Sequence, residues 1–287
     1  MAKKFTEAKK KGSSLVYKHF QLLEIIEQIN SCIENYNFNV YSDTININFV
    51  LCVYKELVQV SDSIFANSKP KEHLIFYELN NDNNIYNKNL ALLHHAYTLT
   101  NASDHARTAF LLTENYKSIE LWQKDSIKGD INILHKTDIP KIQKKLATNQ
   151  ALISYHYGTL SEKTDSSYAF VCTKDTISFQ AITVDTTMIN RYVKELNRYV
   201  VSENYLQYAY QLYQNLFAPL PIDTANIDEL IIIASGRLSL IPFEALLTKN
   251  DNESDFARMS YLLRKYAISY DLSLPFWFKV KSFGQKF

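Results

Sequence analysis

A continuous apolar run at residues 230–234, Leu-Ile-Ile-Ile-Ala, constrains the fold of this chain more than any other feature. Five apolar residues without alternation are typical of a strand that is covered on both faces, as in a parallel sheet flanked by helices. Gly236, one of only five glycines in 287 residues, follows the run almost at once. A glycine there predicts a tight turn with positive φ at the carboxyl end of a buried strand.

Further strand-like segments surround this run. They are ALISYHY (151–157), SYAFVCT (167–173), TISFQAITV (176–184) and residues 267–272. A two-residue joint, Lys174-Asp175, connects the second segment to the third and predicts an antiparallel hairpin. Amphipathic helices are expected near 186–200 and 203–217, between the hairpin and the apolar run. The alternation of helices and strands indicates an α/β layer.

The N-terminal part of the chain is expected to be helical. The predicted helices cover residues 13–36, 46–66, 88–99 and a segment that begins at Ser103. Short polar joints between helices favour a stack of α-hairpins, as in tetratricopeptide-type repeats. No 34-residue period is visible, so an irregular helical bundle fits equally well. The sequence therefore predicts two domains, a helical one at 1–136 and an α/β one at 137–287.

Composition and charge exclude several classes of protein. The formal net charge is +1 and only the first dozen residues are clearly basic, so nucleic-acid binding is not expected. No apolar run approaches the ~20 residues of a membrane helix, and the N-terminus lacks a secretion signal, so we expect no membrane contact. Cys32, Cys52 and Cys172 are scattered, which predicts a reducing, cytoplasmic location without disulfides or zinc. The seven histidines show no ligand spacing, and no metal or cofactor is expected.

Five separated segments together resemble a known family. In order they are NQALISYHYG, YAFVCTKDTISF, YQLYQNLFAPL, ELIIIASGRLSLIPFEALLT and YLLRKYAISYDLS. Their order and spacing resemble the CHAT domain, a caspase-like cysteine peptidase domain of the caspase and separase clan that commonly follows tetratricopeptide repeats. The resemblance covers roughly residues 103–275. It implies a TPR-like helical region followed by an incomplete caspase-like α/β layer with an antiparallel hairpin.

The resemblance also bears on catalysis. In the family, a His and a Cys on strands downstream of the segment matching YAISY form the catalytic dyad. No residue of this sequence matches either one, so no catalytic residue is assigned, and we expect only the N-terminal portion of the domain. Cys172 is expected to be a buried and inert thiol, although a pair with His156 across the hairpin is conceivable.

The loop after the apolar run is the candidate binding site. Ala234-Ser235-Gly236 stands where family members usually have Pro-Asp-Gly, so the turn glycine is kept and the acid is lost. By analogy with caspase-like enzymes this loop lies beside the substrate cleft. Ser235 and Arg237 are therefore candidate substrate-binding residues, with a solvent-facing Arg237 as the alternative. Glu244 is expected to cap a short helix that begins at Pro242.

Three functional hypotheses follow. The first is a portion of a repeat–CHAT protein that cannot cleave peptides alone and docks a protein or peptide partner, with helices 14–125 as the docking surface. We expect strand 229–234 to lack a neighbour and to pair with another polypeptide, the missing C-terminal half of the domain being one candidate. The second is half of a split cysteine endopeptidase completed by a downstream chain. The third is a helical adaptor with a degenerate α/β half.

Overall fold

A computed structural model describes most of the second half of the chain and part of the first. The described residues are 85–123, 138–158, 167–198, 202–250 and 255–274, together with Gln21, Glu24, Cys52, Glu56, Glu253 and Trp277. The chain divides into two compact units, Met1–Thr137 and Asp138–Phe287. The helices expected at 13–36 and 46–66 lie outside the described residues, except for four residues that are helical: Gln21, Glu24, Cys52 and Glu56.

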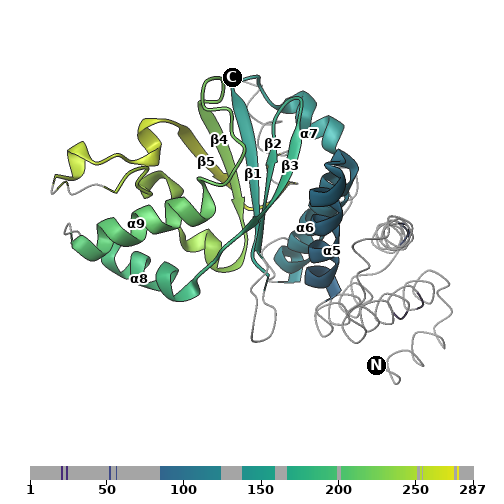
Figure 1. Cartoon of the computed structure of the whole chain (residues 1–287), viewed down its shortest axis with the longest axis horizontal. Helices are drawn as coiled ribbons and strands as arrows, with labels where there is room; N and C mark the ends of the chain where they lie inside the picture. Colours follow the sequence, from purple (N-terminus) through teal and green to yellow (C-terminus); the bar gives the residue numbers. More distant parts are fainter. Residues whose placement is uncertain are drawn as a thin grey trace. The chain divides into compact units, whose positions relative to one another are not determined.

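Two helices of the first unit form an α-hairpin. Helix α5 (Ile85–Thr100) packs against α6 (Ser103–Gln123), which confirms the two helices expected there (Figure 1). Small residues of both helices are fully buried, among them Ala96 in α5 and Ala106 and Ala109 in α6. A single hairpin is common to repeat proteins and to other helical folds, so the TPR-like character of this region stays a prediction.

The second unit is built on a five-stranded mixed sheet with the order β3-β2-β1-β4-β5 (Figure 1). The strands are β1 (Gln150–His156), β2 (Ser167–Cys172), β3 (Ile177–Ile182), β4 (Glu229–Ala234) and β5 (Ala267–Asp271). Strands β1, β4 and β5 run parallel to one another, whereas β2 and β3 form the predicted antiparallel hairpin. The mixed α/β fold expected from the sequence is confirmed for this unit.

Strand β4 has a parallel neighbour on each side. Ile231 stands opposite Leu152 of β1 and Ser269 of β5. The expectation that this strand would lack a neighbour is therefore wrong, and the parallel part of the sheet begins at β1. The reason lies in β1, which is buried along almost its whole length and pairs with the hairpin on one edge and with β4 on the other. Among the described strands the sheet ends at β3 on one side and at β5 on the other.

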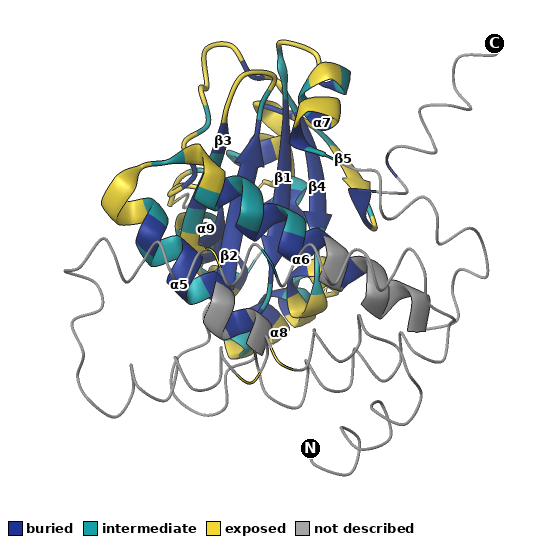
Figure 2. Ribbon diagram, turned by 90° about the vertical axis from the view of Figure 1, so that its right-hand side faces the viewer, coloured by how far each residue is buried: buried dark blue, intermediate teal, exposed yellow. Residues whose placement is uncertain are grey.

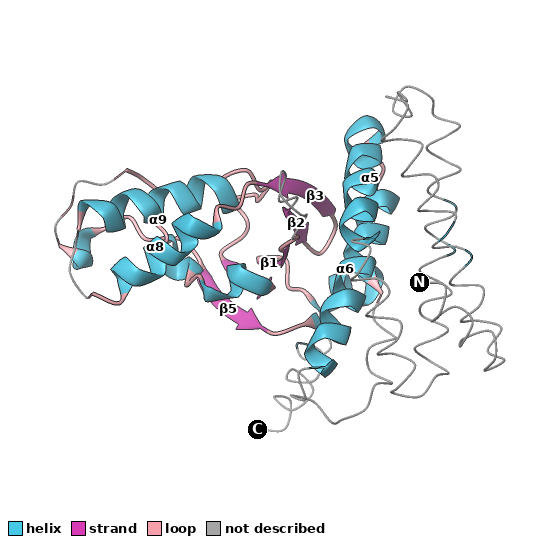
Figure 3. Cartoon of the chain, turned by 90° about the horizontal axis from the view of Figure 1, so that it is seen from below, coloured by secondary structure: helices cyan, strands magenta, loops and turns pink. Residues whose placement is uncertain are grey.

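Helices α8 (Thr186–Leu196) and α9 (Glu203–Leu216) pack together on one face of the sheet (Figure 3). Asp185 and Ser202 cap them, each through a side-chain oxygen that accepts backbone N–H groups of the first turn. The core on this face contains alternate residues of the strands and aromatic residues of the helices. Strands β1, β2 and β4 are largely buried, whereas β5 has no buried residue (Figure 2). Helix α7 (Ile139–Lys145) begins at the predicted cap, Asp138.

The Glu244 carboxylate, in the apolar segment after β4, has a hydrogen-bond partner in β5, the hydroxyl of Tyr270. Phe243–Ala245 forms a single 3-10 turn without a side-chain cap, so the capping role expected for Glu244 is wrong. Tyr270 Oη accepts a hydrogen bond from Phe243 N at 2.7 Å and donates one to the Glu244 carboxylate. Burial, reinforced by the bond to Glu244, raises the pKa of Tyr270, which keeps the hydroxyl protonated and able to donate. Phe243 itself is fully buried and stacks on Tyr155, with ring centroids 4.8 Å apart.

Replacing Tyr270 with Phe is expected to destabilise the second unit. The change leaves Phe243 N–H and Glu244 without their shared partner, which costs about 1–2 kcal/mol of unfolding free energy. Chemical denaturation followed by circular dichroism measures this difference. Tyr208→Phe is the matched control, since the half-buried Tyr208 hydroxyl has no hydrogen-bond partner among the described residues. Equal stability of the two variants would contradict the assigned role.

Candidate functional site

The loop after β4 is tied to the end of β1 by a serine. Ser235 Oγ accepts a hydrogen bond from Tyr157 N at 3.1 Å and donates one to Tyr155 O at 3.2 Å. The hydroxyl thus joins the carboxyl ends of two parallel strands where their ladder stops. Ser235 thus makes structural bonds, and a substrate contact by its side chain stays a prediction.

Gly236 is required by the backbone and by its surroundings. Its φ of 57° lies in the left-handed region, which confirms the positive φ expected at this turn. A Cβ atom at this position would lie 2.9 Å from Cδ1 of Tyr157, closer than carbon atoms approach without moving. The turn therefore disfavours other residue types for two independent reasons.

Arg237 is exposed in the short 3-10 helix Gly236–Leu240. Among the described residues its guanidinium has no ion-pair partner. It follows the carboxyl end of a parallel strand, which is where open α/β sheets bind their ligands. A cleft contact by Arg237 stays a prediction, with a solvated cation as the alternative.

The only cysteine and the only histidine of residues 138–287, Cys172 and His156, do not form a pair. In the β1–β2 ladder, Cys172 stands opposite Leu152 and His156 stands opposite Tyr168. The two positions therefore lie four residues apart along the strand, a distance of about 13 Å. Cys172 is fully buried and its Sγ lies 3.7 Å from Thr173 O. Residues 138–287 therefore hold no thiol–imidazole pair, and the conceivable Cys172–His156 pair is excluded.

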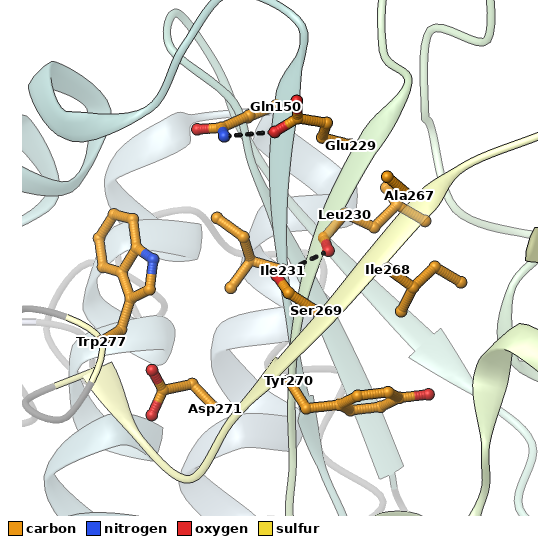
Figure 4. A pocket seen from close by; sticks show the side chains of 10 residues that line it. All are labelled: Gln150, Glu229, Leu230, Ile231, Ala267, Ile268, Ser269, Tyr270, Asp271 and Trp277. Carbon is orange, nitrogen blue, oxygen red and sulfur yellow. Dashed lines mark hydrogen bonds between the residues drawn. The ribbon is translucent and has the colours of Figure 1, made fainter. Parts of the chain in front are cut away.

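An open hollow of about 290 Å³ lies along β5 (Figure 4). It is lined by Gln150 of β1, residues 229–231 of β4, all five residues of β5 and Trp277. The polar members are Gln150, Glu229, Ser269, Tyr270 and Asp271. Gln150 Nε2 donates to Glu229 Oε2 at 2.6 Å, and Ser269 Oγ donates to Leu230 O at 3.3 Å. The hollow thus carries two carboxylates on a floor that includes Ile231.

The outer edge of β5 presents backbone hydrogen-bonding groups. Ala267 N donates to Asp228 O at 2.8 Å, which directs this residue toward β4. Because alternate residues of a strand direct their N–H groups to opposite edges, those of Ile268 and Tyr270 point away from β4. No strand lies beyond β5 in the described part of the chain. Sequence reasoning missed the hollow because its residues come from three separate segments that together span more than 100 positions and form no local motif.

One protein-family model is similar to part of the chain. Residues 206–276 match the CHAT domain. The CHAT match begins within α9 and includes β4, the Gly236 turn, the Tyr270–Glu244 bond and β5, while β1 to β3 precede it. No curated protein sequence matches the chain.

Two further features of the described residues bear on the site. No group of three or more His, Cys, Asp and Glu side chains within them is placed to hold a metal ion. None of their helices combines the length and the apolar character needed to cross a membrane.

Replacing Gly236 with Ala is expected to destabilise the second unit by about 1–3 kcal/mol, because a side chain disfavours positive φ and meets Tyr157. Gly236→Asn separates the two causes, since Asn tolerates this conformation better but brings the same Cβ. A smaller cost for Asn than for Ala assigns the effect to φ, and equal costs assign it to the contact. Denaturant midpoints measure both, and an unchanged midpoint for Ala would refute the argument.

Cys172 is expected to resist alkylation. Iodoacetamide added to the folded protein modifies the exposed Cys52, whereas Cys172 reacts only after denaturation, because a buried thiol in apolar surroundings is neither accessible nor ionised. Mass spectrometry of tryptic peptides reports each site separately. Modification of Cys172 at the rate of Cys52 in the folded protein would contradict its assignment as an inert core residue.

Proposed function

We propose that the second unit recognises a protein partner by accepting an added strand at the outer edge of β5, and that residues 138–287 do not cleave peptides by themselves. The observation that supports this proposal is the exposed outer edge of β5. The N–H groups of Ile268 and Tyr270 point outward, and no described strand covers them. An exposed strand edge of this kind is a template for pairing with another chain.

The surroundings of β5 support pairing with an extended segment. In strand addition, main-chain hydrogen bonds supply affinity and pockets beside the edge receive alternate side chains. Ala267, Ser269 and Tyr270 are all exposed, and the hollow lies directly beside them. The edge therefore offers both backbone groups and room for side chains.

The absence of a thiol–imidazole pair supports the second part of the proposal. A cysteine nucleophile needs a nearby base and a lowered thiol pKa. The single thiol of residues 138–287 is buried in β2, four register positions from the single imidazole. A CHAT segment with these features is suited to binding rather than to peptide hydrolysis.

The proposal also assigns each of the two units to a type of domain. We infer that residues 137–287 correspond to the N-terminal portion of a caspase-like CHAT domain, and that the α5–α6 hairpin belongs to a TPR-like region at residues 1–136. Helices of that kind offer a second docking surface for a protein partner. A cytoplasmic location fits three cysteines without a close pair.

A second candidate function is half of a split caspase-like cysteine endopeptidase. The CHAT match favours it, because the family is related to caspase-like peptidases. In that case another polypeptide supplies both catalytic residues. Peptide hydrolysis that appears only after mixing with such a polypeptide, and that disappears on alkylation, identifies this function. Hydrolysis by residues 138–287 alone would contradict both candidates.

Strand addition predicts a specific response to N-methylated peptides. The probe is a fluorescent seven-residue peptide that alternates Thr and Val, made in two variants with three N-methyl groups each, on the Val or on the Thr amides. Alternate amides of a strand face opposite edges, so only one variant loses the hydrogen bonds to β5. We expect that variant to bind about tenfold more weakly or worse, while the other keeps the affinity of the parent peptide.

Fluorescence anisotropy measures the three dissociation constants. If both methylated peptides bind as tightly as the parent peptide, or if both bind much more weakly, the peptide does not pair as a strand. Absence of binding by the parent peptide would likewise refute the proposed function.

A further inference from the structure

The row of outward-facing amides along β5 is interrupted at both ends by bonds within the chain. Just before the strand, Tyr266 N donates to Leu262 O at 3.1 Å. Just after it, Leu272 N donates to Asp271 Oδ1 at 2.8 Å. Neither of these two amides is available to an added strand, so the edge that can pair is short.

Two residues of β5 remain whose N–H and C=O groups both face outward, Ile268 and Tyr270. Ser269 lies midway between them, and its backbone groups face β4 (Figure 4). The available donors and acceptors are therefore arranged symmetrically about Ser269. A set of this kind is matched in full by a copy of itself that is turned about a two-fold axis.

We propose that the strand added at β5 is β5 of a second copy of this chain, antiparallel to the first, with the two-fold axis at Ser269. This inference rests on the proposed function, since it names the partner that the edge accepts. In this arrangement Ile268 stands opposite Tyr270 of the partner subunit, and the pair occurs twice by symmetry. Each pair exchanges two N–H···O bonds, so all four outward amides of the two strands are bonded. Such an interface closes on itself in a dimer, the commonest symmetric assembly.

The bonds at the two ends of the edge select this register. If Ile268 stood opposite Ile268 of the partner subunit, each Tyr270 would meet the partner's Tyr266, whose amide is already bonded. If Tyr270 stood opposite Tyr270 of the partner subunit, each Ile268 would meet the partner's Leu272, whose amide is bonded as well. The register centred on Ser269 is the one that uses every available amide.

The side chains that meet in this register suit each other. Ile268 is β-branched and Tyr270 is aromatic, a combination that stabilises neighbouring strands when the two residues stand opposite each other. Tyr270 is 48% exposed, and its hydroxyl is already bonded to Phe243 N and to Glu244. Its ring is therefore the part left for Ile268 of the partner subunit to cover.

The register also keeps like charges apart. Asp271 is the only charged residue of β5, and it stands opposite the small Ala267 of the partner subunit. Glu229 lies beside Ala267 on β4, one strand further away. Two strand spacings, roughly 10 Å, thus separate Asp271 from the partner's Glu229, a distance at which salt screens exposed charges. No pair of like charges stands directly opposite another, the arrangement that destabilises paired strands.

A cysteine at the two-fold axis tests the register. Ser269→Cys is made in the chain with Cys32 and Cys52 replaced by Ser, so that the buried Cys172 is the only other thiol. The two copies of residue 269 form a non-hydrogen-bonded pair with Cα atoms about 4.5 Å apart, which suits a disulfide. With oxidised glutathione as the oxidant, we expect rapid formation of a covalent dimer, followed on non-reducing gels.

Ala267→Cys is the matched control, since Ala267 is exposed on the same strand. In the proposed dimer it lies about 13 Å from its own copy, because it stands opposite Asp271 of the partner subunit. We expect it to cross-link about tenfold more slowly than Ser269→Cys or worse. A mixture of Ala267→Cys with Asp271→Cys is expected to cross-link rapidly, although neither variant does so alone. Thermal melts confirm that each variant folds.

Sedimentation velocity of the unaltered chain measures the dimer directly. Four hydrogen bonds and two side-chain pairs make a small interface, so we expect a dissociation constant on the order of 10–100 μM. An excess of the Thr–Val peptide occupies the same edge and is expected to dissociate the dimer and to slow the cross-linking of Ser269→Cys. The N-methylated peptide that cannot pair with β5 is expected to do neither.

The outcomes separate this inference from the proposed function. If the peptide pairs as a strand while the chain stays monomeric up to about 1 mM, strand addition stands and the second copy is the wrong partner. Cross-linking of Ala267→Cys as fast as that of Ser269→Cys would also overturn the inference, as would a dimer that the peptide leaves intact. If Ser269→Cys cross-links selectively and the peptide competes with it, both hold.

Discussion

The parallel pairing of β4 with β1 on one side and β5 on the other is the interaction on which the second unit depends. Four consecutive residues of β4 are buried, and they are covered only because both neighbours are present. The same register brings the carboxyl ends of β1 and β4 together, so that Ser235 can bond to the backbone at Tyr155 and Tyr157. Loss of either ladder would expose apolar surface and remove the support of the loop.

Local chemistry predicted the elements of this unit well. The continuous apolar run predicted a buried strand, the two-residue joint predicted a hairpin, and Asp138 predicted the start of a helix. Each of these signals depends on residues within a few positions of one another. The same holds for Gly236, since positive φ at the end of a strand is a property of the turn itself.

Pairings between distant segments were not predictable in this way. Glu244 looked like a helix cap because the local pattern offered no other partner, whereas its partner is Tyr270, 26 positions away. Ser235 bonds to a carbonyl 80 positions away, so its structural role is invisible in the loop sequence. Glu229 and Asp271 line the same hollow only because the register of the sheet places Glu229 beside Ala267 of β5. Periodicity shows which residues are buried but not which strands become neighbours.

Peptide cleavage and strand recognition make different demands on a sheet. Cleavage needs a thiolate and an imidazole in contact, and a displacement of four residues along a strand is enough to prevent it, as with Cys172 and His156. Strand recognition needs only outward backbone groups at an edge, which any residue except proline supplies. Specificity then comes from the side chains on either face of the edge. A sheet can therefore bind an extended polypeptide without a catalytic pair.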